Sequence, residues 1–179
     1  MLDLLRDVSG ELTGRGVAHA LIGAAALTVH GVSRSTFDLD LLVTDRSVLV
    51  PEAWSRRRAA GDGVDLRCGD DDDPLAGVVR LTRPGSRSVD VVVGRSAWQA
   101  GVLQRADPHD LGGLVLDVVS RPDLVLLKLF AGGPQDGWDV EQLLALGDQA
   151  ALRAAVEREL GRLPAEATVL WHRFGRSDR

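Results

Sequence analysis

The chain has 179 residues, of which 45% are apolar and 26% charged, and its formal net charge is −5 at pH 7. We expect a chain of this size to form one self-sufficient core, and its composition argues against wholesale disorder. The single cysteine, Cys68, excludes an internal disulfide and a zinc site made of several thiolates. No apolar run approaches the ~20 residues of a membrane span, and the N-terminus lacks the basic start of a signal peptide. We therefore expect a cytoplasmic bacterial protein with no membrane partner.

Helices and strands alternate in the first two thirds of the chain. Apolar residues at helical spacing predict a helix over 2–15, a short apolar run predicts a strand over 17–23, and alanines predict a helix over 24–30. The other predicted strands are 37–43, 64–68, 77–82, 87–93 and 114–118, and the other predicted helices are 46–60, with an early break at Pro51, and 96–105. Pro84, Gly85 and Ser86 form the turn between strands 77–82 and 87–93.

The last third of the chain is predicted to be helical. Ser120 is placed as an N-cap, with a proline at the second position after it and Asp123 at the third. Predicted helices cover 123–131, 136–146 and 149–160. The fold class is therefore α/β (α+β), a mixed β-sheet flanked by helices with a helical C-terminal section. We expect residues 1–118 to form the α/β core and residues 119–179 to pack on it as one structural unit.

Two aspartates lie two residues apart in the predicted strand 37–43. Residues two apart in a strand project from the same face, so Asp38 and Asp40 point the same way while Leu39 and Leu41 face the core. Adjacent carboxylates repel unless a cation lies between them, and Mg²⁺ or Mn²⁺ prefers such oxygen ligands. An exposed strand face that merely alternates polar and apolar residues explains the pair equally well.

Two further features favour the metal interpretation. Asp90 is a lone carboxylate in an apolar strand, where it must be exposed, paired or metal-bound. Gly23 ends a predicted strand and opens a predicted helix, which places backbone N–H groups where an anion could bind. If the strand of Asp90 neighbours that of Asp38 and Asp40, the three acids converge on a site for one or two metal ions that support phosphoryl transfer.

These pieces together resemble the nucleotidyltransferase superfamily, the fold of DNA polymerase β, aminoglycoside nucleotidyltransferases and minimal bacterial nucleotidyltransferases. The similarity lies in the glycine turn, the run from Gly31 to Asp40, the later lone aspartate, and the run from Ser120 to Asp139 with the only lysine of the chain, Lys128. The two runs are most similar to those of AbiEii-type toxin nucleotidyltransferases and their relatives, and the resemblance spans residues 17–146.

The resemblance implies a role for each matching residue. The residues implied in catalysis are Asp38, Asp40, Asp90, Lys128 and Asp136, and the first three are also the implied metal ligands. The residues implied in binding the nucleotide phosphates are Gly23, Ala24, Ser33, Arg34 and Lys128. Helix capping explains Asp136 equally well, and Asp139 shares its helix face. The family's turn usually carries a hydroxyl residue after the glycine, whereas Ala24 and Ala25 follow Gly23, and Thr28 is the nearest substitute.

The expected function is transfer of a nucleoside monophosphate from an NTP to an acceptor hydroxyl with Mg²⁺ or Mn²⁺. In the toxin branch the acceptor is tRNA and the partner is a separately encoded antitoxin, and Arg56, Arg57 and Arg58 could contact an RNA backbone. The acidic balance weighs against tRNA and leaves a small hydroxylated molecule, as in antibiotic-type nucleotidyltransferases. The alternative is a catalytically silent nucleotide-binding or regulatory protein on the same fold.

Overall fold

The computed structural model describes residues 2–34 and 38–175, which form two compact units. The first unit comprises Met1–Ala25 and Ser35–Val119, and the second comprises Ala26–Arg34 and Ser120–Arg179. The change of unit after Val119 falls one residue from the expected boundary, but the segment Ala26–Arg34 joins the C-terminal unit, which the sequence did not indicate. The expectation that the C-terminal section packs on the core as one unit stays a prediction.

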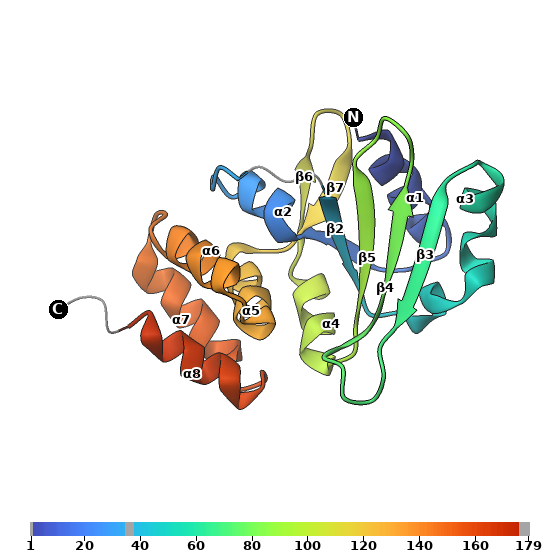
Figure 1. The fold of residues 1–179 in the computed structure, drawn as a ribbon. Coiled ribbons are helices and arrows are strands. Elements are labelled where there is room, and N and C mark those ends of the chain that lie inside the picture. The colour runs from blue at the N-terminus through green and yellow to red at the C-terminus, as the bar shows by residue number, and fades with distance from the viewer. Residues whose placement is uncertain (1, 35–37, 176–179) are drawn as a thin grey trace. The chain divides into compact units, whose positions relative to one another are not determined.

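A mixed sheet forms the centre of the first unit (Figure 1). The strands among the described residues are β1 (His19–Ile22), β2 (Asp38–Val43), β3 (Gly63–Cys68), β4 (Leu75–Thr82), β5 (Ser88–Gly94), β6 (Asp107–Asp110) and β7 (Val115–Val118), in the order β3-β4-β5-β2-β1-β7-β6. The pairs β2–β5 and β1–β7 are parallel and the others are antiparallel. The predicted mixed sheet is confirmed, except that Phe37 lies outside the described residues and β6 was not predicted.

Short helices complete the first unit. They are α1 (Asp3–Gly14), α3 (Ser55–Ala59), α4 (Ala97–Gln104) and the 3₁₀ turns η1 (Arg46–Leu49) and η2 (Pro51–Trp54), while α2 (Gly23–Val29) divides between the two units. The predicted helix over 46–60 is divided near its predicted break at Pro51: residues 46–49 and 51–54 form 3₁₀ turns, and α3 follows at 55–59. Asp45 caps the first turn by accepting from the backbone N–H of Ser47 at 2.8 Å, and Pro51, which lacks an N–H, opens the second turn.

The core of the first unit lies against one face of β2 and β5. Leu39 and Leu41 of β2 are buried, whereas Asp38 and Asp40 alternate with them and keep partial exposure. The same alternation in β5 buries Val89 and leaves Asp90 half-buried. Helix α1 contributes Leu4, Leu5, Val8 and Leu12, which are 0–1% exposed. The acids therefore occupy the face of the sheet opposite these buried side chains, as the period-two pattern predicted.

The second unit is helical apart from its N-terminal segment. Its helices are α5 (Arg121–Ala131), α6 (Pro134–Leu144), α7 (Gln149–Leu160) and α8 (Ala165–Arg173). Ser120 caps α5 as predicted, because its hydroxyl accepts from the backbone N–H of Asp123 at 3.3 Å. Helix α6 begins at Pro134, two residues before the predicted start, since proline suits the first helical position. None of the described helices combines the length and apolar content that a bilayer crossing requires.

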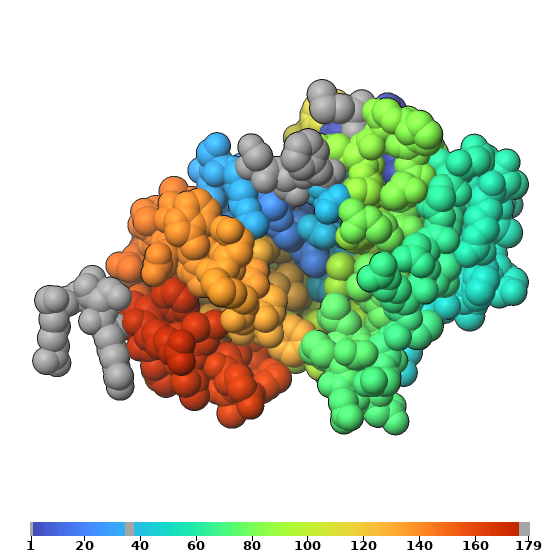
Figure 2. Space-filling view, viewed as in Figure 1, coloured from blue at the N-terminus to red at the C-terminus, as the bar shows by residue number. Residues whose placement is uncertain are grey.

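Helix α8, which was not predicted, is fixed to α7 by a tryptophan. Trp171 of α8 is 2% exposed, and the guanidinium of Arg153 on α7 lies 5.1 Å from the centroid of its ring. The same arginine donates a hydrogen bond to the carbonyl of Phe174 at 2.7 Å. Figure 2 shows α7 and α8 as adjoining parts of one surface.

Candidate functional site

The three predicted metal ligands lie on two neighbouring strands of the first unit. Asp38 and Asp40 are on β2, and the parallel pairing of β2 with β5 sets Asp40 directly opposite Asp90. Directly opposite residues of paired strands project from the same face of a sheet. The structure thus brings the predicted third acid beside the first two, although it lies 50 residues later than Asp40 in the sequence. Their role as metal ligands stays a prediction.

Arg80 of β4 joins two of these acids, and the sequence interpretation missed it. Its register partner across the antiparallel pair is Asp90. Its Nη2 donates to Asp38 Oδ1 at 2.9 Å, and its Nη1 lies 3.4 Å from Asp90 Oδ2. The pairing of Arg80 with Asp90 could have been predicted from the sequence, because a hairpin centred on the turn at Gly85 places these two residues opposite each other.

The carboxyl of Asp90 lies in an environment that disfavours its charged form. Burial raises its pKa above the ordinary value, and the nearby Asp38 charge raises it further, while Arg80 acts in the opposite direction. Its Oδ1 is buried and, among the described residues, has no hydrogen-bond partner. A cation that reaches this oxygen would remove both penalties.

The donor chemistry of this cluster fits a divalent ion. Carboxylate oxygens are the ligands that Mg²⁺ and Mn²⁺ prefer, and the buried Oδ1 of Asp90 has no hydrogen-bond partner among the described residues. In the part of the chain that the structure describes, no three ligating side chains are gathered closely enough to hold a metal ion. The guanidinium of Arg80 lies between Asp38 and Asp90 in this arrangement.

Gly23 is required where β1 meets α2. Its φ is +66°, a left-handed conformation that glycine adopts without strain. A Cβ at this position would lie 2.1 Å from Oδ2 of Asp40. The turn therefore approaches Asp40 as closely as a bare backbone allows, and this explains the glycine without a ligand. The phosphate-binding roles of Gly23 and Ala24 stay predictions, as does the substitution of Thr28 for the missing hydroxyl.

The second unit holds a separate cluster of charges around Asp139. This carboxylate has 0% side-chain exposure, and its Oδ2 contacts Nη1 of Arg34 and, at 2.8 Å, Nζ of Lys128. The other oxygen, Oδ1, is buried without a hydrogen-bond partner among the described residues. A buried charge needs paired cations, so Asp139 holds both residues that the resemblance assigned to phosphate binding. Sequence reasoning had placed Asp139 only on the same helix face as Asp136.

Asp136 links the same lysine to the start of α6. Its Oδ1 accepts from Lys128 Nζ at 2.8 Å, and its Oδ2 accepts from the backbone N–H of Gly133 at 3.1 Å. The capping interpretation is thus confirmed, and the active-site role stays a prediction. Ser33 is exposed next to Arg34, and its predicted phosphate contact is likewise untested. Both cations already have carboxylate partners, so a phosphate would have to share them.

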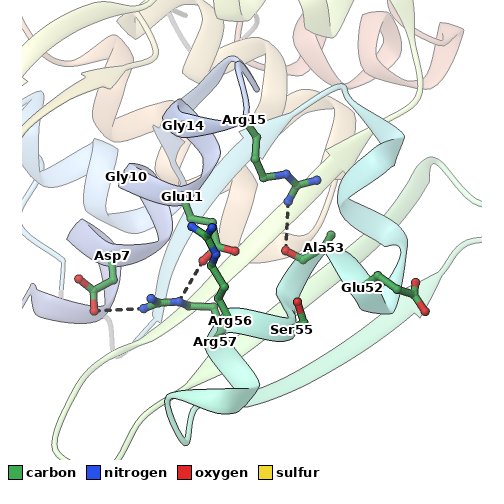
Figure 3. A pocket seen from close by; sticks show the side chains of 10 residues that line it. All are labelled: Asp7, Gly10, Glu11, Gly14, Arg15, Glu52, Ala53, Ser55, Arg56 and Arg57. Carbon is green, nitrogen blue, oxygen red and sulfur yellow. Dashed lines mark hydrogen bonds and ion pairs between the residues drawn. The ribbon is translucent and has the colours of Figure 1, made fainter.

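One of the three arginines of the basic run on α3, Arg57, is paired with acids of the first unit. Arg57 reaches Asp7 at 3.2 Å and Glu11 at 3.0 Å on α1, and these contacts line a groove of about 590 Å³ (Figure 3). It also lies 3.6 Å from Asp62, which is 6% exposed. Arg58 donates to the carbonyl of Pro51 at 2.8 Å. The pairing of Arg57 therefore reduces the positive charge that this run offers an RNA backbone.

Comparison with known proteins identifies the fold. No protein-family profile and no curated protein sequence matches the chain. The crystal structure of ANT(2")-Ia with adenylyl-2"-tobramycin is similar with a TM-score of 0.59 at 13% identity, covering 90% of this chain and 97% of that one. A Thermotoga maritima protein assigned as a nucleotidyltransferase gives 0.55 at 15% identity, with 80% and 91% covered. The lincosamide antibiotic adenylyltransferase LnuA with lincomycin bound gives 0.51 at 11% identity, with 80% and 96% covered.

These likenesses show that the chain has the nucleotidyltransferase fold, as the resemblance predicted. They do not show that the chain is closer to the AbiEii-type toxins than to other nucleotidyltransferases.

Proposed function

We propose that this protein transfers a nucleoside monophosphate from an NTP to an acceptor hydroxyl. The observation that carries the proposal is the register of β2 and β5, which sets Asp40 beside Asp90 and leaves Asp38 on the same face. On the nucleotidyltransferase fold, the carboxylates of this group are the kind of ligand that Mg²⁺ or Mn²⁺ prefers. When bound, the metal would neutralise charge on the phosphate oxygens during an in-line displacement.

The residues of the first unit have distinct parts in this proposal. Asp38 and Asp40 hold the metal, and Asp90 either completes its ligands or accepts the proton of the acceptor hydroxyl. In the balanced reaction the acceptor oxygen bonds to the α-phosphorus of the NTP, the bond from that phosphorus to pyrophosphate breaks, and the hydroxyl proton passes to Asp90 or, where Asp90 is a metal ligand, to water.

The cations of the second unit are proposed to bind phosphate groups. Lys128 is 13% exposed and Arg34 is 26% exposed, so both keep some access to solvent while Asp139 holds them. A guanidinium has five N–H donors and an ammonium has three, and each can serve a phosphate oxygen beside a carboxylate. Asp136 fixes the position of Lys128 from the other side.

We infer that the acceptor is a small hydroxylated molecule rather than tRNA. The net charge of −5 opposes binding to a polyanion, and the internal pairing of Arg57 weakens the basic patch that RNA would need. ANT(2")-Ia and LnuA, which share the fold, were solved with an adenylylated aminoglycoside and with lincomycin. The expected antitoxin partner draws no support from the fold and stays an expectation.

The test is transfer of label from α-³²P-labelled NTPs to added acceptors in the presence of Mg²⁺. Tobramycin, lincomycin and total tRNA are supplied in separate reactions, and labelled products and pyrophosphate are measured. We expect label on a small hydroxylated acceptor, lost in Asp38→Asn plus Asp40→Asn. The matched control is Asp65→Asn on β3, an exposed acid paired with Arg67, which should retain activity.

Three results would contradict parts of the proposal. Transfer that survives the double substitution would show that the assigned acids are not the site. Label on tRNA alone would overturn the choice of acceptor. Stabilisation of the protein by NTP against heat, without release of pyrophosphate under any condition, would identify the silent nucleotide-binding alternative.

A further inference from the structure

Arg80 is the cationic partner shared by two of the proposed metal ligands. Its guanidinium lies 2.9 Å from Asp38 Oδ1 and 3.4 Å from Asp90 Oδ2, and it also donates to the hydroxyl of Ser88 at 3.3 Å. The antiparallel register fixes its backbone directly opposite Asp90. The contacts are therefore a product of the sheet and do not depend on a mobile loop.

The guanidinium and a divalent ion would compete for the same oxygens. Asp38 and Asp90 repel each other, and a single positive charge at Arg80 relieves that repulsion. Mg²⁺ requires direct oxygen contacts at about 2.0–2.1 Å, which an oxygen already bonded to a guanidinium cannot provide in the same direction. The Arg80 side chain is 45% exposed, so it has solvent on one side into which it can move.

We propose that Arg80 is a displaceable counter-ion, which holds Asp38 and Asp90 in place before the metal arrives and leaves them when it binds. This inference rests on the proposed metal-dependent function. The nucleotide-free protein should therefore bind metal more weakly than a variant without the Arg80 charge, because every binding event must break the arginine contacts. Arg80 is a positioning residue in this scheme and takes no part in the bond-forming step.

The experiment measures Mn²⁺ binding to the full chain without nucleotide, by electron paramagnetic resonance of the free ion. Arg80→Met should lower the Kd for Mn²⁺ about tenfold, which corresponds to ~1.4 kcal/mol and is the scale of two partly exposed ion pairs. Arg80→Gln is a second neutral variant, in case the methionine variant folds poorly. Arg80→Lys, which retains the charge, should bind within about twofold of the original protein, a smaller change than a lost ion pair gives.

Arg67→Met supplies the matched control. Arg67 lies on the neighbouring strand β3, and its charge acts on Asp90 from a distance. Among the described residues its ion pair is with Asp65, and it makes no direct contact with the three acids. Its loss should change the Kd by less than about twofold, as expected for an exposed charge at long range. A gain of affinity shared equally by the Arg67 and Arg80 variants would overturn the inference, since general electrostatics would then explain it.

The remaining outcomes separate this inference from the proposed function. If Arg80→Met binds Mn²⁺ no more tightly than the original protein while Asp38→Asn abolishes binding, the metal site stands and the role of Arg80 is wrong. If neither the original protein nor any Arg80 variant binds Mn²⁺, the proposed metal site is wrong and the inference is overturned with it.

Discussion

Alanine in place of Gly23 tests how closely the β1–α2 turn approaches Asp40. The substitution has two separate energetic costs. The left-handed conformation at φ +66° costs an L-residue about 1–2 kcal/mol. The new Cβ would lie 2.1 Å from Oδ2 and 2.9 Å from Cγ of Asp40, and overpacking of this kind typically costs about 1–3 kcal/mol. We therefore expect a total loss of about 2–5 kcal/mol in the free energy of unfolding.

Gly16 provides a control with the same backbone conformation and no neighbour. Its φ is +70°, and a Cβ there meets no described atom within 4 Å. Gly16→Ala should therefore carry only the conformational cost of about 1–2 kcal/mol. The lost freedom of glycine in the unfolded chain is common to both variants and cancels in their difference.

The assay is thermal unfolding followed by circular dichroism. For a chain of this length, 1 kcal/mol shifts the Tm by about 2–4 °C, so Gly23→Ala should melt about 2–12 °C below Gly16→Ala. The displaced Asp40 carboxylate should also weaken Mn²⁺ binding in the Gly23 variant alone. Equal Tm values for the two variants, with unchanged Mn²⁺ affinity, would refute the close approach of the turn to Asp40.

Two further predictions concern carboxylates outside the proposed metal cluster. Asp139→Asn should lower the free energy of unfolding by about 3 kcal/mol, because it removes the buried charge that pairs with Arg34 and Lys128. Asp136→Asn, which removes a more exposed contact, should lower it by about 1 kcal/mol. Urea denaturation measures both losses, and equal losses would contradict the special role of the buried Asp139. The hydrogen bond from Arg83 holds the pKa of Asp7 below its ordinary value of 3.8. Asp7→Asn should therefore lower the Tm slightly at pH 7, and it should leave the Tm unchanged at a pH far below 3.8. The stabilisation is therefore present above that value and lost as the pH falls through the lowered pKa, and a Tm difference independent of pH would show otherwise.

The period-two pattern was sufficient to predict the strands that carry the acids. Leu39 and Leu41 alternate with Asp38 and Asp40, and this local alternation by itself predicts both the strand and the face of each side chain. The proximity of Asp90 was only a conditional prediction, because the parallel pairing of β2 and β5 is a long-range contact that local sequence does not encode.

Other features were missed for different physical reasons. Strand β6 begins with Asp107 and Pro108, residues that are rare in strands, and it exists because it pairs with β7 at the sheet edge. The burial of Asp139 depends on cations from two other segments, Arg34 and Lys128, which no local pattern brings together. Arg80 was predictable from the hairpin register but was treated as one of many arginines in an arginine-rich chain.

Strand β2 has a hydrogen-bonded neighbour on each side, β1 and β5, over the segment that contains Asp40. Neighbouring strands lie about 4.8 Å apart, and this spacing is a property of the backbone ladder rather than of the side chains. The main chains beneath Asp40 and Asp90 are therefore held at a constant separation. Ions of different radius must be accommodated by rotation about the side-chain bonds of the two aspartates, so selectivity between such ions depends on which rotamers the surrounding side chains permit.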